Sequence, residues 1–218
     1  MFKANGLSIV LIALFLVTMG GQAVTGWKAH NQDLLDHGRA PAPFAAYLGS
    51  GHFLEATGEN WESEFLQMAL FVLLTTFLYQ KGSAESKRPS VVEEVDLDPR
   101  RFQDDPEAPW PVRRGGWLLR VYEHSLGLTF VILFFLSLWI HAAGGLQELN
   151  EEQRAHGQPA VSMTEYVGGA QFWFESFQNW QSEFLSLAAM VVGTIVLRQR
   201  GSAESKPVHA SHRDTGRA

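Results

Sequence analysis

Residues 126–143 read LGLTFVILFFLSLWIHAA and contain no Asp, Glu, Lys or Arg. A membrane-spanning helix needs about 20 mainly apolar residues, because the hydrocarbon layer is about 30 Å thick. This stretch comes close to that length. It therefore predicts a transmembrane helix.

Three further apolar blocks lie at residues 7–24, 65–79 and 184–197. The first is as long as the block at 126–143, and the other two are shorter. Only 18% of the residues are charged, below the roughly 25% of typical soluble domains. We therefore predict an all-α protein, a bundle of four transmembrane helices.

The chain also repeats itself. Residues 60–66 read NWESEFL and residues 179–185 read NWQSEFL, and a shift of 119 positions aligns the two halves without a gap. Roughly a third of the paired residues are identical, as expected of a tandem repeat. We predict two parallel two-helix repeats, residues 1–87 and 117–206, with a Pro- and acid-rich cytoplasmic linker at 88–116 and a disordered tail at 207–218.

The first apolar block, with Lys3 ahead of it, has the features of a secretory signal. Its counterpart in the repeat is the internal block at 126–143, which no signal peptidase removes. We therefore expect the first block to be retained as a transmembrane helix.

Basic residues indicate the orientation. Lys and Arg gather at residues 81–120 and 198–206, whereas the loops at 25–59 and 144–178 carry only three. Basic segments next to transmembrane helices stay in the cytoplasm. Both termini are thus expected in the cytoplasm. The net charge of −6 and the lack of a dominant basic patch argue against nucleic acid as a partner.

The NWxSEFL motif stands where the second helix of each repeat is expected to begin. Asn60 and Asn179 suit helix N-caps. Trp61 and Trp180 suit the membrane interface, and Lys81 and Arg200 suit the same role at the opposite helix ends.

The same motif offers a polar helix face. Asn60, Glu64 and Gln67 follow the i, i+4, i+7 spacing of one face. Polar faces inside a membrane point to the protein interior or to a water-filled cavity, so Glu64 and Glu183 could line a proton or cation pathway. Alternatively, the asparagines cap their helices and the two glutamates interact favourably with the helix dipoles. A third possibility is that this polar face contacts a partner. The candidate intramembrane polar site comprises Asn60, Ser63, Glu64, Gln67, Asn179, Ser182, Glu183 and Ser186.

The string GSAESK ends each second helix, at 82–87 and 201–206. Its glycine suits the left-handed position just past a helix end. In the outer loops, His37 and His156 each precede a glycine, and we expect them to contact the last carbonyls of a short polar helix that starts near Trp27 or Gly145.

Aromatic residues in these loops predict short amphipathic helices on the outer surface. They are Tyr47, Phe53, Tyr166, Phe172, Trp173, Phe174 and Phe177.

No chemical motif stands out. The chain has no Cys, which removes thiolate ligands and Cys nucleophiles. A metal site at His37 and His156 lacks a ligand spacing signature, and His124 and His141 are poorly placed for haem. We therefore assign no catalytic, cofactor or metal residue.

The two NWxSEFL motifs, the two GSAESK strings and the paired Tyr-x-Gly segments (Tyr47 and Gly49, Tyr166 and Gly168) resemble a bacterial membrane family described only as a domain of unknown function. The resemblance covers residues 5–206. It implies a location in the bacterial inner membrane, and it transfers no activity or catalytic residue.

Three functions follow as hypotheses. Absent motifs and small residues such as Gly20 and Gly21 favour a non-enzymatic module that associates with the lipid bilayer, with a second copy or with a larger membrane complex. The alternative is the Glu64 and Glu183 pathway. A lipid- or quinone-linked membrane enzyme is favoured only by the aromatic outer loops.

Overall fold

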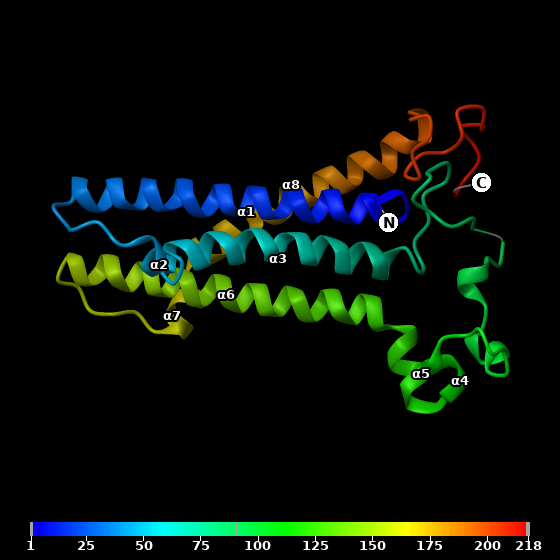
Figure 1. Ribbon diagram of the computed structural model, residues 1–218, viewed down its shortest axis with the longest axis horizontal. Helices are drawn as coiled ribbons and strands as arrows, with labels where there is room; N and C mark the ends of the chain where they lie inside the picture. The colour runs from blue at the N-terminus through cyan, green and yellow to red at the C-terminus, as the bar shows by residue number, and fades with distance from the viewer. Residues whose placement is uncertain (1, 90, 217–218) are drawn as a thin grey trace. The chain divides into compact units, whose positions relative to one another are not determined.

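A computed structural model describes residues 2–89 and 91–216, and these residues form helices and turns without a strand. Figure 1 shows their arrangement along the chain. The all-α prediction is confirmed. The helices are α1 (Phe2–Asp36), α2 (Phe44–Tyr47), α3 (Gly51–Leu74), α4 (Trp110–Arg114), α5 (Gly116–Glu123), α6 (Ser125–Ala155), α7 (Met163–Gly168) and α8 (Ala170–Val196), with 3-10 turns η1 (Glu94–Asp96) and η2 (Pro99–Phe102).

Two of the described helices, α1 from Ala4 onward and α6, are long and apolar enough to cross a membrane. The predicted second and fourth spans lie in the C-terminal parts of α3 and α8, which do not meet that test. Their N-terminal parts are polar, with three acids in α3 between Glu55 and Glu62. Four transmembrane helices thus stay a prediction.

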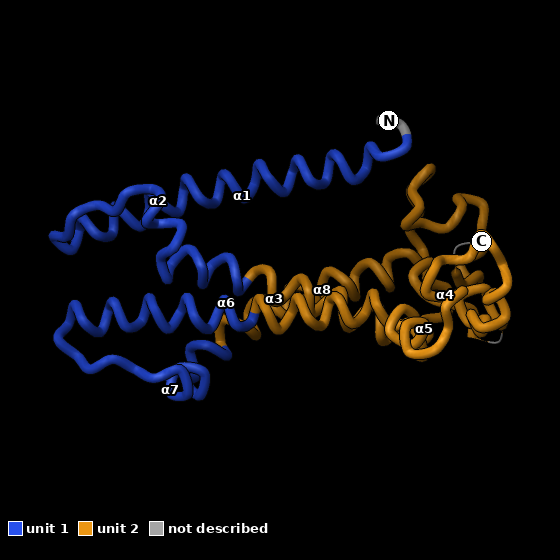
Figure 2. The backbone as a smooth tube through the Cα atoms, turned by 60° about the horizontal axis from the view of Figure 1, so that its bottom comes forward, with its two compact units in different colours: residues 1–59, 138–173 blue, residues 60–137, 174–218 orange. Residues whose placement is uncertain are grey.

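The chain divides into two compact units, coloured separately in Figure 2. Unit 1 holds residues 1–59 and 138–173, and unit 2 holds residues 60–137 and 174–218. The boundary passes through α3, α6 and α8, so each of these continuous helices contributes to both units. Each unit is described separately below.

In unit 1, α1 and α6 end in the same way. Gly38 and Gly157 have φ of 72° and 68°, and their amides donate to the carbonyls of Leu35 and Arg154. This is the left-handed glycine stop that satisfies the last carbonyls of a helix. The expected separate polar helices are wrong, because no proline interrupts either segment and the long helices continue to these glycines.

An asparagine in each long helix of unit 1 holds the loop that follows. The Asn31 side chain donates to the Ala42 carbonyl (3.1 Å) and accepts from the Ala42 amide (2.7 Å). Asn150 makes the same pair with Val161, at 3.1 and 2.7 Å. Each amide side chain thus pairs with one backbone residue through both of its polar groups.

Glycines bring α3 and α6 together within unit 1. A Cβ added to Gly58 would lie 2.8 Å from His141 Cα, and one added to Gly144 would lie 2.9 Å from Glu55 Cα. Both neighbours are backbone atoms, which cannot swing aside. The two helices therefore approach more closely here than any larger side chain would allow.

The expected helix starts at Asn60 and Asn179 are wrong. Helix α3 begins at Gly51 and α8 at Ala170, so both asparagines lie inside helices. The Asn179 side chain donates to the Glu175 carbonyl one turn earlier (3.2 Å). The preceding residues lack a proline, and the helices extend backward through them. The predicted aromatic surface helices are likewise wrong at Phe172–Phe177, since these residues begin α8, whereas α2 and α7 are short helices as expected.

The GSAESK glycines, both in unit 2, have the predicted positive φ, 87° at Gly82 and 84° at Gly201. They are not helix stops, because α3 and α8 end earlier, at Leu74 and Val196. Residues 88–116, the predicted linker, carry η1, η2 and α4.

Two described residues of the tail contact the first GSAESK string. The Gly216 amide donates to the Ser83 carbonyl (2.9 Å), and Thr215 Oγ1 accepts from the Gly82 amide (2.9 Å). These contacts lie within unit 2 and place residues 215 and 216 against the first GSAESK string.

Candidate functional site

Part of the predicted polar face assembles in unit 2. Gln67 Nε2 donates to the Glu183 carbonyl (2.8 Å) and to Ser186 Oγ (3.1 Å). The carboxyl group of Glu64 is an electrostatic neighbour of the Glu183 carboxyl group. Glu64 is exposed and Glu183 is half-buried. Both predicted carboxylates therefore belong to one polar contact between α3 and α8.

The other members of the predicted site make local contacts. Ser63 is 3% exposed, and its hydroxyl donates to the Asn60 carbonyl (2.9 Å). Ser182 is exposed and donates to the Asn179 carbonyl (2.8 Å). Asn60 itself is exposed. These hydroxyls satisfy carbonyls of their own helix and bind nothing across the contact.

Glu62 is a buried carboxylate of unit 2 that the sequence did not reveal. It is fully buried, and Trp180 Nε1 donates to its Oε1 atom (3.1 Å). Trp180 was predicted as an interface anchor, which stays a prediction, and its indole nitrogen donates to this buried carboxylate. The sequence does indicate that Glu62 and Glu64 face opposite ways, because they are two positions apart in one helix.

The two predicted cationic anchors differ in burial from Lys206, the lysine that ends the second GSAESK string. Lys81 and Arg200 are exposed. Lys206 is 1% exposed. Its ammonium group, which has three N–H donors, lies within hydrogen-bond distance of four backbone carbonyls in unit 2, those of Gly82, Ser211, His212 and Asp214.

Unit 1 contains a second polar cluster, which the sequence did not reveal. His141 of α6 is fully buried, and the ligand atoms of Glu55 and His141 lie within 4.8 Å of each other. Tyr166 Oη donates to Glu55 Oε1 (3.3 Å). A Cβ at Gly145 would contact Tyr166 Oη and lie 2.6 Å from Glu55 Oε1. The missing side chain of Gly145 thus leaves the room in which these two groups meet.

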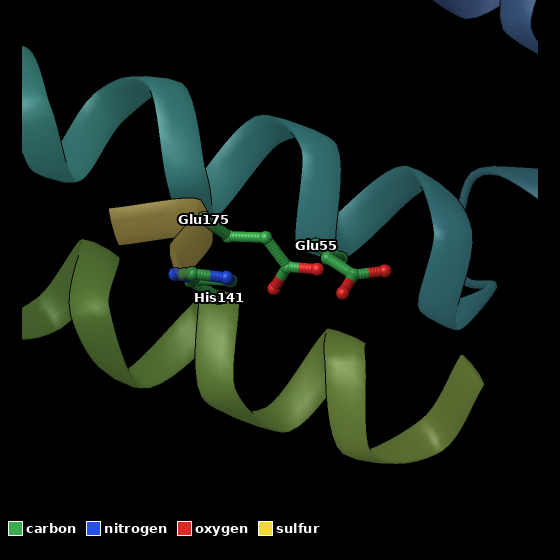
Figure 3. A group of neighbouring side chains, drawn as sticks. All are labelled: Glu55, His141 and Glu175. Carbon is green, nitrogen blue, oxygen red and sulfur yellow. The ribbon is translucent and has the colours of Figure 1, made fainter. Parts of the chain in front are cut away.

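An aromatic ring fixes the plane of the buried imidazole. The rings of His141 and Phe172 stack with centroids 4.8 Å apart and planes inclined by 29°. Helix α8 continues beyond Phe172, and Glu175 follows it by three residues, which places both side chains on one helix face. Figure 3 draws Glu175 with Glu55 and His141.

A neighbouring group in unit 1 surrounds Tyr47. Its hydroxyl lies 3.1 Å from His52 Nδ1, and the His52 amide donates to Glu148 Oε2 (3.0 Å). Burial raises the pKa of the Tyr47 hydroxyl, and the Glu148 carboxylate raises it further. The hydroxyl therefore stays protonated and can donate to His52.

The loop histidines lie where the sequence predicted, at the ends of α1 and α6. The Nδ1 atoms of His37 and His156 lie 2.9 Å from the carbonyls of Asp33 and Glu152. Both side chains are exposed. They contact carbonyls at the helix ends and belong to neither buried cluster.

The fold and these clusters define a class: an all-helical protein with two helices able to cross a membrane and with ionisable groups buried among its helices. The chain belongs to the family described as domain of unknown function DUF6766, whose sequence profile matches residues 1–217. No curated protein and no solved structure is significantly similar to the chain. The predicted membership of a family of unknown function is confirmed.

Proposed function

We propose that the protein is an integral membrane protein of the bacterial inner membrane, with four transmembrane helices in two tandem repeats and both termini in the cytoplasm. The matching contacts of Asn31 and Asn150 support the repeat, because these residues are 119 positions apart. The matching glycine stops support it too. Helices α1 and α6 support the membrane location.

We further propose that the protein is non-enzymatic and works by association with a second copy through α1. The observation that carries this proposal is the exposed apolar surface of that helix. Val17 is 73% exposed and Val24 is 44% exposed, on the face that also holds Gly21. No heavy atom lies within 4 Å of a Cβ added to Gly20 or Gly21. Small residues flanked by valines let a second helix approach closely.

Disulfide cross-linking tests the association. The chain has no Cys, so single variants Val17→Cys, Gly21→Cys and Val24→Cys can be oxidised in native membranes without a background. We expect each to give a covalent dimer on a non-reducing gel. Positions 17, 21 and 24 share one helix face, and two copies meeting there bring equal residues together.

The matched controls are Met19→Cys and Ala23→Cys, at similar depth on the opposite face of α1. Ala23 is 7% exposed within the chain, so neither control should cross-link. Equal cross-linking on both faces, or no dimer from any variant, would contradict association through α1.

A proton or cation pathway is the second candidate, and the contact around Gln67 favours it. Two carboxylates, Glu64 and Glu183, interact electrostatically beside the Gln67 amide. Paired ionisable groups within membrane helices mark ion pathways and proton relays. A lipid- or quinone-linked enzyme gains no support, because Phe172 packs in the core of unit 1 with Tyr166.

Flux through liposomes tests the pathway. Purified protein is expected to dissipate a proton or sodium gradient, and the Glu64→Gln/Glu183→Gln double variant is expected to fall to the level of protein-free liposomes. Glutamine keeps the size of the side chain and removes its charge. Glu94→Gln/Glu107→Gln, which changes two exposed linker carboxylates, is the control. Flux unchanged in the first double variant would reject the pathway.

A further inference from the structure

The short helix α5 of unit 2 has an exposed apolar face. Trp117 is 71% exposed and Val121 is 52% exposed, and their spacing of four residues places both side chains on one side of the helix. Leu119 is 1% exposed, so the opposite side of α5 is the packed one. A tryptophan this exposed is unfavourable in water and favourable at a membrane interface, where the indole ring finds both apolar and wet surroundings.

Three exposed arginines lie in α4 and α5, which pack against each other. Arg113 and Arg114 end α4, and Arg120 lies within α5. None of the three forms an ion pair among the residues that the structure describes. The one acid of α5, Glu123, comes four residues after Leu119 and therefore lies on the packed side. The exposed side of the helix pair thus combines apolar and positively charged groups.

The connection to α6 places this surface next to the membrane. Helix α6 begins at Ser125 and is long and apolar enough to cross a membrane. Between the two helices, His124 has φ of −113° and ψ of 5°, which breaks the helix and lets α5 run in a different direction from α6. Figure 1 shows α4 and α5 together at the start of α6. A transmembrane α6 would therefore hold α5 at the membrane surface.

We propose that the α4–α5 surface docks on the cytoplasmic face of the membrane and binds anionic phospholipids; it consists of Arg113, Arg114, Trp117, Arg120 and Val121. Trp117 and Val121 enter the interfacial layer, as the apolar side of an amphipathic helix does. The guanidinium groups bind lipid phosphates, whose geometry suits the paired N–H donors of arginine. Basic residues beside a transmembrane helix are attracted to the anionic lipids of the cytoplasmic leaflet. This inference rests on the proposed membrane location and names the lipid class that this segment recognises.

Single-cysteine labelling measures the depth of this surface. The chain has no Cys, so full-length Val121→Cys can carry one environment-sensitive fluorophore in nanodiscs of phosphatidylcholine, with or without phosphatidylglycerol. With phosphatidylglycerol, we expect blue-shifted emission that lipid-borne nitroxides quench and acrylamide in the water does not. Added salt should reverse the shift, because ions screen exposed charges. The control is Val95→Cys, at a valine of unit 2 that is 78% exposed, which should stay accessible to acrylamide in both lipids.

Charge variants test the class of lipid. Each basic residue near an anionic membrane surface favours docking by about fivefold. Arg120→Gln should therefore lower the ratio of docked to undocked α5 about fivefold in phosphatidylglycerol discs, and Arg113→Gln/Arg114→Gln/Arg120→Gln should lower it roughly hundredfold. Arg154→Gln, in the last turn of α6, should leave the ratio unchanged. All of these arginines are exposed, so we expect the variants to keep the fold.

A second label separates this inference from the membrane location on which it rests. Ile132 lies in α6 and is 62% exposed, and a fluorophore on Ile132→Cys should be quenched by nitroxides deep in the acyl chains of both lipids. Lipid around position 132 with water around position 121 would overturn the α4–α5 surface alone. Water around both positions would overturn the membrane location as well. Equal docking of α5 in the two lipids, or with and without the three arginines, would overturn the binding of anionic phospholipids.

Discussion

Gly58→Leu is expected to lower the free energy of unfolding by about 3 kcal/mol, the upper part of the range for overpacked cores. A Cβ at this position would meet the backbone of Ile140 and His141, with His141 Cα 2.8 Å away. Backbone atoms in a helix cannot move without shifting the whole of α6. The better helix propensity of leucine, about 1 kcal/mol over glycine, is too small to offset this clash.

Thermal unfolding followed by tryptophan fluorescence in detergent measures the effect. Gly193→Leu in α8 is the matched control, because a Cβ there meets only Leu197 Cδ1, at an ordinary contact distance of 3.8 Å, and leucine gains helix propensity over glycine there too. We expect the control to melt at or above the wild-type temperature. If Gly58→Leu has the same melting temperature as the wild type, the close contact of α3 and α6 does not exist in solution.

Lys206→Met is expected to release the described tail from the first GSAESK string. Hydrogen bonds to a charged group contribute about 1.5–3 kcal/mol each, and the ammonium of Lys206 donates to carbonyls at both ends of this contact, Gly82 and Asp214. A net loss of about 3 kcal/mol corresponds to a roughly hundredfold faster local opening. Hydrogen exchange of the amides of Gly82 and Gly216 should accelerate by that factor.

The repeat provides the comparison for this experiment. Lys87 occupies the equivalent place in the first string and pairs with Asp96, and both side chains are partly exposed. Exposed pairs contribute at most about 1 kcal/mol. Lys87→Met should therefore leave the exchange of Gly216 unchanged. Equal exchange in the two variants would show that the four carbonyls do not hold the tail through Lys206.

The sequence predicts the helical class well, because that signal is local. The apolar runs indicate the helices α1 and α6, and His37 and His156 lie at helix ends as expected, although the helices that end there are the long ones and not separate short ones. The starts of α3 and α8 were misplaced. An asparagine is favourable at a helix start and tolerated inside a helix, and only the neighbouring turn decides between the two.

The candidate site was harder to predict, because burial depends on how a helix is rotated against its neighbours. Glu62 and Glu64 differ by two positions and face opposite ways, and the repeat favoured Glu64 because Glu183 matches it. The buried residue is Glu62, whose counterpart is Gln181. Glu55 and His141 are far apart along the chain and follow no ligand spacing, so only the folded helices bring them together.

The asparagine pairs of unit 1 have a consequence for chemical ageing. Asparagine loses its amide nitrogen slowly by deamidation, which leaves a carboxylate. At Asn31 or Asn150 the product would keep the acceptor for the loop amide but lose the donor, and its negative charge would face the carbonyl of Ala42 or Val161. Aged protein would thus carry loosened loops after α1 and α6 while these long helices stay intact, and the same lesion would strike both halves of the chain.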